Sequence, residues 1–271
     1  MGGSVALALS QQGHRVRGVT RSEDTLHTAL QMGAVEGGSL DLSAEVAQAG
    51  LVLVAAPTQT SIRLLGSIAS LAPPDLILTD ACSSKGEVVR AMNALPPGAR
   101  AVGGHPMAGK EVAGIQGADP ALFHGATWVL SKTNSSEGRP SEVCELLARL
   151  CGSEVLWVDA EEHDRAVATI SHLPLLTAAA LVLAAEESGS ELAWRLAASG
   201  FRDTTRLAAG EPEMGADLAL TNSDAVRAAH GLFAEQLGGL VDAARAQDKP
   251  RLLALLAQAA ARRQAMYRRE Q

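Results

Sequence analysis

The chain has 271 residues, a net charge of −7 and an apolar content of 47%. This length suits one large or two modest domains with a real core, and with this apolar content disorder is not the default expectation. The acidic balance argues against general nucleic-acid binding, which needs a basic face. Aromatic residues make up only 3% of the chain, so the core must be built from Ala, Leu and Val.

The cysteines and the apolar stretches indicate the cellular compartment and whether the chain enters a membrane. Cys82, Cys144 and Cys151 lack the spacing of a metal site, and an odd number of cysteines is typical of a reducing cytosol. The longest mostly apolar stretch, residues 173–185, contains Pro174 and is too short to span a bilayer. We therefore expect a cytoplasmic protein that does not enter a membrane.

Helix and strand patterns alternate over the first part of the chain. Apolar runs at residues 51–55, which Pro57 ends, and at residues 76–79 are typical of buried parallel strands. The other expected strands are residues 15–19, 101–103, 128–130 and 154–158, and the expected helices are residues 4–12, 22–32, 59–70, 84–95 and 141–151. This alternation predicts an α/β fold with a doubly wound, mostly parallel sheet covered on both faces.

Strand patterns end near Asp159. The rest of the chain has helical patterns over residues 161–188, 191–199, 223–247 and 249–268. We therefore expect a dinucleotide-binding domain over residues 1–159 and an all-helical domain over residues 160–271.

The front of the chain bears on the cofactor. A Rossmann unit needs a strand, then G-x-G-x-x-G, then a helix whose N-terminus binds the pyrophosphate. Here Met1-Gly2-Gly3 leads straight into a helix, so we expect the first strand and the first two glycines to be absent. Because that strand lies at the centre of such a sheet, we expect a gap beside residues 51–55, or strands closed together across it. Gly2, Gly3 and Pro57 are candidate cofactor contacts.

The ribose of a dinucleotide is bound about 20 residues past the fingerprint, at the end of the second strand. Thr20, Arg21 and Ser22 stand there, and none is an acid that could accept from a 2′-hydroxyl. An arginine between two hydroxyls suits a 2′-phosphate, so we predict NADP, with NAD possible. The alternative is a solvated loop arginine.

Polar residues follow the strand at residues 76–79, where open α/β sheets bind ligands. We expect Ser83 or Ser84 to cap the next helix, and Lys85 to be solvated or to pair with Asp80. The acids and histidine at residues 161–164 begin a helix, where acids favour the dipole, so we interpret them as structural and expect no metal.

Three segments combine a base with a carboxylate clamp: Gly-Gly-His-Pro-Met-Ala-Gly at residues 103–109, Ser-His-Leu-Pro at 171–174, and Gly-Phe-Arg-Asp-Thr-Thr-Arg at 200–206. His105 lies in a glycine-lined loop that a ligand can approach, and imidazole can take a proton near neutral pH. Arg202 and Arg206 would share one helix face, although surface ion pairing is the common alternative. His172 is as compatible with a packed core histidine as with a ligand contact, and Pro174 can kink a core helix.

These segments, in this order, resemble the prephenate and arogenate dehydrogenases of tyrosine biosynthesis over nearly the whole chain. The resemblance implies NAD(P)-dependent oxidative decarboxylation of prephenate to 4-hydroxyphenylpyruvate. It implies that His105 accepts the proton of the ring hydroxyl and that Ser83 helps to hold that hydroxyl. The implied substrate contacts are Ser171, His172, Arg206 on the ring carboxylate with Arg202 beside it, and Glu111, which gates the pocket.

Several alternatives stay open. Many prephenate-using members follow Ser-His-Leu-Pro with a second His, and this chain has Leu175, which leaves room for arogenate or both substrates. The helical domain is expected to form a homodimer. The rival hypotheses are a hydroxyacid or imino-acid reductase of the same architecture, and a non-catalytic dimerising module.

Overall fold

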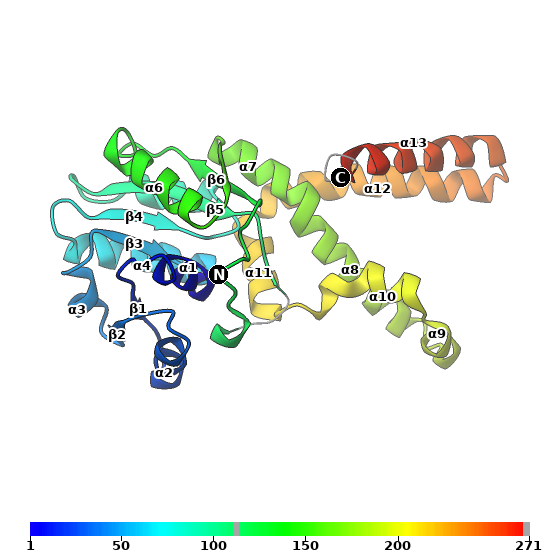
Figure 1. Ribbon diagram of the computed structural model, residues 1–271. Helices are drawn as coiled ribbons and strands as arrows, with labels where there is room; N and C mark the ends of the chain where they lie inside the picture. The colour runs from blue at the N-terminus through cyan, green and yellow to red at the C-terminus, as the bar shows by residue number, and fades with distance from the viewer. Residues whose placement is uncertain (111–113, 268–271) are drawn as a thin grey trace. The chain divides into compact units, whose positions relative to one another are not determined.

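The structure is a computed structural model that describes residues 1–110 and 114–267. It has two compact units, Met1–Ser223 and Asp224–Gln271. The strands, shown in Figure 1, are β1 (Arg17–Val19), β2 (Gly37–Ser39), β3 (Leu51–Val54), β4 (Ile77–Asp80), β5 (Arg100–Pro106), β6 (Thr127–Ser131) and β7 (Glu154–Trp157). The helices among them are α1 (Gly2–Ser10), α2 (Glu23–Gln31), α3 (Leu42–Val46), α4 (Thr58–Leu71), α5 (Gly86–Asn93), the 3₁₀ turn η1 (Ile115–Gly117) and α6 (Arg139–Leu150).

The strands form two sheets. β1 pairs with β2 in parallel, and the larger sheet has the order β3-β4-β5-β6-β7. All neighbours in the larger sheet are parallel except β5 and β6, which are antiparallel. The predicted mostly parallel α/β fold is confirmed, and so is the expected gap between the strand at residues 15–19 and the strand at residues 51–55.

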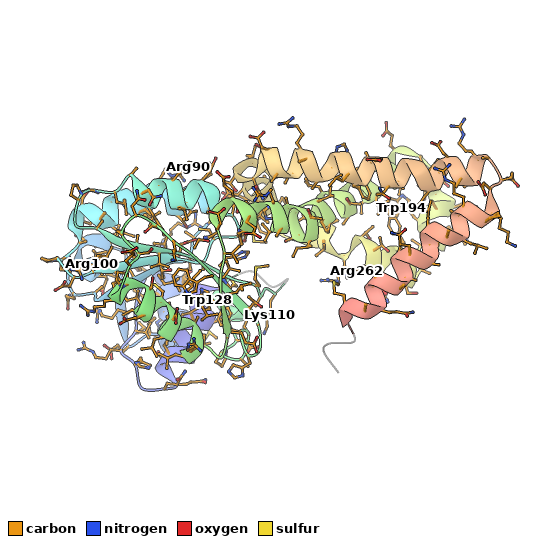
Figure 2. The ribbon with its side chains drawn as sticks, turned by 90° about the horizontal axis from the view of Figure 1, so that it is seen from above. Arg90, Arg100, Lys110, Trp128, Trp194 and Arg262 are labelled. Atoms are coloured by element: carbon orange, nitrogen blue, oxygen red, sulfur yellow. The ribbon has the colours of Figure 1, made fainter. Side chains whose placement is uncertain are left out.

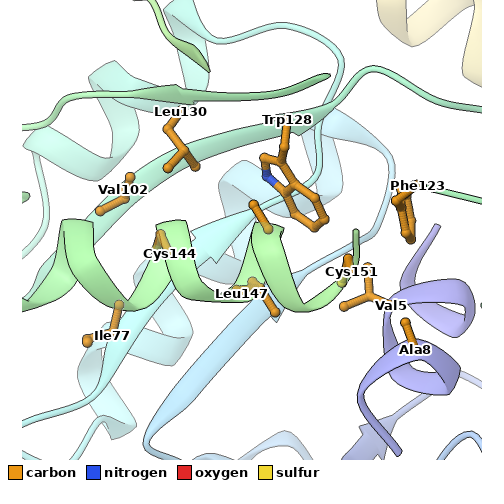
Figure 3. Packing of buried hydrophobic residues seen from close by; sticks show 11 residues of the cluster. Val5, Ala8, Ile77, Val102, Phe123, Trp128, Leu130, Cys144, Leu147 and Cys151 are labelled. Atoms are coloured by element: carbon orange, nitrogen blue, oxygen red, sulfur yellow. The ribbon is translucent and has the colours of Figure 1, made fainter. Parts of the chain in front are cut away.

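Helices cover both faces of the larger sheet. On one face, Trp128 and Leu130 of β6 pack against Cys144 and Leu147 of α6, and α1 adds its apolar side, as Figure 3 shows. On the other face, α3, α4 and α5 contribute the buried cluster that includes Val46, Leu65, Ile68, Val88 and Met92. Adjacent strand residues supply opposite faces, because side chains alternate along a strand: Ile77 belongs to the first cluster and Leu78 to the second.

The last part of the Met1–Ser223 unit, from Ala160 on, is helical. Its elements are α7 (Ala160–Val167), the π-helix η2 (Ala168–His172), α8 (Leu173–Glu187), α9 (Glu191–Leu196), α10 (Ser199–Thr205), the 3₁₀ turn η3 (Arg206–Ala209) and α11 (Pro212–Thr221). The sequence analysis missed α11, although Glu211 caps it by accepting from the N–H of Met214 at 2.9 Å and Pro212 begins it. Trp194 of α9 stacks edge-on against Phe201, and Figure 2 shows Trp194 away from Trp128 in the sheet.

α7, η2 and α8 continue one another, so Pro174 does not end the helix. A proline removes one N–H and displaces the carbonyl four residues earlier, and the π-turn just before Pro174 accommodates both effects. The resulting segment, Ala160–Glu187, is long and apolar enough to cross a membrane by length and composition alone, which is weak evidence for a span. The expectation that the apolar stretch is too short to span does not hold for the continuous helix.

The Asp224–Gln271 unit consists of most of α12 (Ser223–Arg245) and α13 (Lys249–Tyr267). The turn between the two helices closes with a 2.9 Å hydrogen bond from the N–H of Asp248 to the carbonyl of Ala243. Gln247 has a positive φ of 55° there, which suits a tight reversal of the chain.

Candidate active site

Asp80, the last residue of β4, organises one side of the site. Its carboxylate is fully buried and accepts hydrogen bonds of 2.8 Å from the N–H of Cys82 and from the N–H of Gly104. The ammonium of Lys85, which is also fully buried, pairs with the same carboxylate. Of the two roles that the sequence left open for Lys85, the structure shows the ion pair.

His105 lies inside β5, where it pairs with Val129 of β6, and not in the loop that the sequence predicts. The strand continues through the glycines because β6 supplies a ladder partner. Gly104 serves close packing within the protein and not ligand approach: a Cβ there would lie 2.5 Å from the carbonyl oxygen of Asp80. The strand therefore fixes the backbone of His105 firmly beside the end of β4.

The imidazole of His105 is 9% exposed. Its Nδ1 lies 2.9 Å from Nε2 of His163, whereas its Nε2 forms no hydrogen bond within residues 1–110 and 114–267. Burial lowers the pKa of His105 well below the usual 6.5, and the nearby Lys85 ammonium and the His163 and His172 rings lower it further. The ring is therefore neutral near neutral pH, as a proton acceptor must be.

α7 brings a second histidine and an acid to the site, which the sequence analysis missed. Asp159 caps this helix, as expected for a helix start, by accepting from the N–H groups of Glu161 and Glu162. His163 and Asp164 follow one turn later, buried, with Nδ1 of His163 2.9 Å from Oδ1 of Asp164. The Asp-Arg pair after this His gave no local sign of this role, because the contacts are with residues far away in the chain.

The cap of α5 also comes from Asp164. Its carboxylate accepts from the N–H of Lys85 at 2.6 Å and from the N–H of Gly86 at 2.7 Å. The expectation that Ser83 or Ser84 caps this helix is wrong. Ser84 is buried and donates instead to the hydroxyl of Thr221 at 2.9 Å, and Ser83 is half-buried in the bend between β4 and α5.

His172 closes the cluster from η2. Its side chain is 2% exposed and its Nδ1 lies 3.3 Å from Nδ2 of Asn222, which also donates to the carbonyl of Asp164 at 2.8 Å. Burial lowers the pKa of His172, with Asp164 opposing the shift. Among the described residues, Nε2 of His172 is buried without a hydrogen-bond partner. Ser171, its neighbour in the π-helix, is exposed.

The expected carboxylate clamp comes from a different part of the unit. Arg202 on α10 is exposed and lies 3.1 Å from Asp203, which is the surface ion pair named as the alternative. Arg206 begins η3 and is also exposed. Figure 1 shows α10 beside the part of α8 that is remote from the sheet. Glu111 lies outside the described residues.

The candidate cofactor contacts lie near the ends of β1 and β3. Gly2 is close enough to the segment after β3 that a Cβ on it would lie 3.0 Å from Cβ of Ala55, which matches the helix-to-strand packing role of a third fingerprint glycine. Pro57 stands at the N-cap position of α4, and Gly3 packs against η1.

The segment after β1 is exposed. The hydroxyl of Ser22 is the N-cap of α2, accepting from the N–H of Thr25 at 3.2 Å, as the sequence predicts. Thr20 donates to the carbonyl of Ser22 at 2.8 Å, and Arg21 is exposed. Arg21 is thus the side chain of this segment best able to reach a phosphate.

All three cysteines are buried free thiols. Over the part of the chain that the structure describes, no group of three or more His, Cys, Asp and Glu residues could hold a metal ion.

Comparison with known proteins decides the family. Residues 5–155 match the family description "Prephenate dehydrogenase, nucleotide-binding domain", and residues 159–258 match "Prephenate dehydrogenase, dimerization domain". The chain belongs to the prephenate dehydrogenase family. The sequence resemblance is thereby confirmed.

Individual relatives agree. The prephenate dehydrogenase of Bacillus subtilis (strain 168) is 33% identical over 232 residues, which are 83% of this chain and 62% of that protein. The crystal structure of prephenate dehydrogenase from A. aeolicus with hydroxyphenyl propionate and NAD+ is similar with a TM-score of 0.92 and 26% identity, covering 98% of this chain and 94% of that one. Synechocystis arogenate dehydrogenase gives a TM-score of 0.80 and 30% identity, covering 97% and 95%. The match thus spans less than two thirds of the B. subtilis protein.

Proposed function

We propose that this chain is a dehydrogenase that converts prephenate to 4-hydroxyphenylpyruvate by NAD(P)-dependent oxidative decarboxylation, with arogenate as the alternative substrate. The observation that carries the proposal is the buried, neutral imidazole of His105, whose Nε2 is left for a ligand while its Nδ1 is bound to His163. Family membership supports the substrate class, and a relative's complex with hydroxyphenyl propionate and NAD+ supports a ring-bearing carboxylate beside a nicotinamide.

His105 takes the proton of the C4 hydroxyl at Nε2. The O–H bond breaks, its electrons form the carbon–oxygen double bond, and the C4 hydrogen leaves with its electron pair. Loss of carbon dioxide from C1 returns an electron pair to the ring, which becomes aromatic with the oxygen as a phenolate. Because aromatisation drives the reaction, the protein needs mainly to position the substrate, remove the proton and bind the carboxylates.

The nicotinamide nucleotide, when bound, accepts the hydride. Gly2, Gly3 and Pro57 would lie beside it at the ends of the strands, and the packing of Gly2 against Ala55 fits the third glycine of a dinucleotide fingerprint. The exposed Arg21 would bind a 2′-phosphate, so we assign NADP as the preferred nucleotide.

Ser83, Ser171 and His172 are assigned to the substrate pocket, with Glu111 at its mouth. The substrate carboxylate would be bound by Arg206, with Arg202 beside it. A guanidinium binds a carboxylate through two parallel hydrogen bonds, which gives both orientation and affinity.

We also assign residues 160–271 to a helical substrate and dimerisation domain. Many large apolar side chains of this part are exposed in the single chain: Ile170, Leu183, Leu192, Leu196, Leu220, Leu232, Leu253, Leu256 and Met266. Exposed apolar surface on this scale marks an interaction site, and the matched "dimerization domain" supports a second copy of the chain as the occupant. Free thiols fit a reducing cytosol, and a cytoplasmic location stays a prediction.

The test is to supply the purified chain with prephenate or arogenate, each with NAD or NADP, and to compare the four values of kcat/KM. We expect turnover with at least one substrate and a preference for NADP. Turnover of a hydroxyacid with no turnover of either cyclohexadienyl substrate would assign the chain to the rival reductase activity. Dimerisation without nucleotide binding would assign it to the non-catalytic alternative.

A further inference from the structure

A continuous chain of hydrogen bonds runs from His105 through His163 to Asp164. The distances are 2.9 Å from Nδ1 of His105 to Nε2 of His163, and 2.9 Å from Nδ1 of His163 to Oδ1 of Asp164. The three side chains are buried, with 9%, 2% and 7% exposure. The two rings meet edge-on at 76°, with centroids 5.1 Å apart.

The hydrogen bonds of Asp164, at one end of this series, determine which ring nitrogens carry protons. Both oxygens of Asp164 accept backbone N–H groups, those of Lys85 and Gly86, and a backbone N–H can only donate. Burial raises the pKa of Asp164, but the hydrogen bonds from His163, Lys85 and Gly86 outweigh burial and hold that pKa below its usual value. Asp164 is therefore an ionised, acceptor-only partner, and Nδ1 of His163 must carry the proton between them.

The hydrogen bond between His163 and Asp164 also determines where His105 carries its proton. With Nδ1 of His163 donating to Asp164, the Nε2 of His163 is the ring nitrogen that can accept a hydrogen bond from His105. Nδ1 of His105 must then carry a proton and donate it to that nitrogen. The lone pair of His105 is left on Nε2, the ring atom that faces no partner among the described residues.

We propose that His163, anchored by Asp164, is a positioning residue that holds His105 in the Nδ1–H tautomer and makes Nε2 the atom that receives the substrate proton. This proposal rests on the proposed function. When Nε2 takes the proton, the ring becomes an imidazolium, and its Nδ1–H bond to His163 becomes charge-assisted.

Charged groups near His105 also bear on the charge that its ring carries after it takes a proton. The Lys85 ammonium, from the segment before α5, and the rings of His163 and His172, from α7 and η2, all oppose a positive charge on His105. The Asp164 carboxylate faces the site from α7 and is linked to His105 through His163. His163 therefore connects the base to a carboxylate through two hydrogen bonds.

Two substitutions of His163 separate the hydrogen bond to His105 from general packing. In His163→Asn, the amide reaches only as far as Nδ1 of the histidine did, so Asp164 keeps a partner and His105 loses one. In His163→Gln, the amide oxygen reaches the former place of Nε2 and can accept from His105. We expect kcat to fall by about 10–10²-fold in the Asn variant, a part of what a general base contributes, with KM little changed and most of kcat restored in the Gln variant.

The tautomer itself can be measured separately from turnover. In protein labelled with ¹⁵N-histidine, the ring nitrogens of His105 are identified among the seven histidines by their loss in His105→Asn. We expect a protonated Nδ1 and an unprotonated Nε2 for His105 in the wild type and in His163→Gln, and a mixture of tautomers in His163→Asn. A wild-type His105 protonated on Nε2, or an unchanged tautomer and turnover in His163→Asn, would overturn the proposal. Absence of turnover in the wild type with the expected tautomer would instead refute the proposed function alone.

Discussion

The carboxylate of Asp80 accepts a 2.8 Å hydrogen bond from the backbone N–H of Gly104, which ties the end of β4 to the strand that carries His105. The two backbones approach so closely that a Cβ on Gly104 would lie 2.5 Å from the carbonyl oxygen of Asp80 and 3.0 Å from Oγ1 of Thr79. Position 104 therefore requires a residue without a side chain.

Gly104→Ala should accordingly destabilise the protein, because backbone atoms cannot move aside as a flexible side chain can. Overpacking of this kind costs about 1–3 kcal/mol in the free energy of unfolding, measured by urea denaturation. Gly66→Ala is the matched control: it lies exposed inside α4 with nothing within 4 Å of its added Cβ, and it should gain about 0.5–1 kcal/mol. Equal effects of the two substitutions would show that β5 can move away from β4.

Acid should weaken the fold through the buried histidines. His105 and His172 have lowered pKa values in the folded state, so they take up protons on unfolding once the pH falls below their usual 6.5. The stability that they contribute is complete above that pH and is lost as the pH drops, by about 1.4 kcal/mol per pH unit for each proton taken up. Asp164 acts in a separate window, because its lowered pKa affects stability only near and below its usual 3.8.

The free energy of unfolding measured between pH 7 and pH 5 checks this sign. His105→Asn should make the pH dependence shallower, whereas substitution of the exposed His14 should leave it unchanged. A stability that rises on acidification over this interval would contradict the burial of neutral histidines.

The proposed contact of Arg206 with the substrate carboxylate predicts that Arg206→Ala raises KM by roughly 10²-fold with a smaller effect on kcat, because losing a charged contact weakens the ground state and the transition state alike. Arg202→Ala is the comparison, since its guanidinium pairs with Asp203 on the surface and we expect a much smaller change. Steady-state kinetics on both variants shows which arginine binds the substrate carboxylate. A larger effect in the Arg202 variant would move the clamp to that residue.

Arg21→Asp should reverse or abolish the proposed preference for NADP, because it would replace the proposed partner of the 2′-phosphate with a like charge. The measurement is the ratio of kcat/KM for NADP and NAD in the two proteins. The cap of α2 belongs to Ser22 and should survive the change, so the melting temperature serves as the control. A wild type that uses both nucleotides equally would refute the assignment.

Local patterns predicted most of the α/β fold but little of the contacts within the site. The strands around Leu51 and Ile77, the cap at Ser22 and the helix start at Asp159 depend on neighbours in sequence, and each was predicted. The cap of α5 depends on Asp164, which is 78 residues from Gly86, and no local pattern announces a cap that comes from another helix.

His105 was identified as a candidate base, but the expectation that it lies in a loop was wrong, because its strand depends on pairing with a distant segment. Glycines at residues 103 and 104 suggest a loop, whereas the antiparallel pairing with β6 extends the strand through them. His163 was interpreted as part of a helix start because its spacing to His105 exists only after folding. The clamp at Arg206 stays a prediction.

The most direct test of the proposed chemistry is to measure reduced nucleotide and carbon dioxide in the same reaction, for the wild type and for His105→Asn. Removal of the proton, loss of hydride and loss of carbon dioxide belong to one reaction, so the wild type should form both products in equal amounts. His105→Asn should lower kcat by about 10²–10⁴-fold, the contribution of a general base, with nucleotide binding retained. Near-normal turnover of the variant, or reduced nucleotide formed by the wild type without carbon dioxide, would contradict the account.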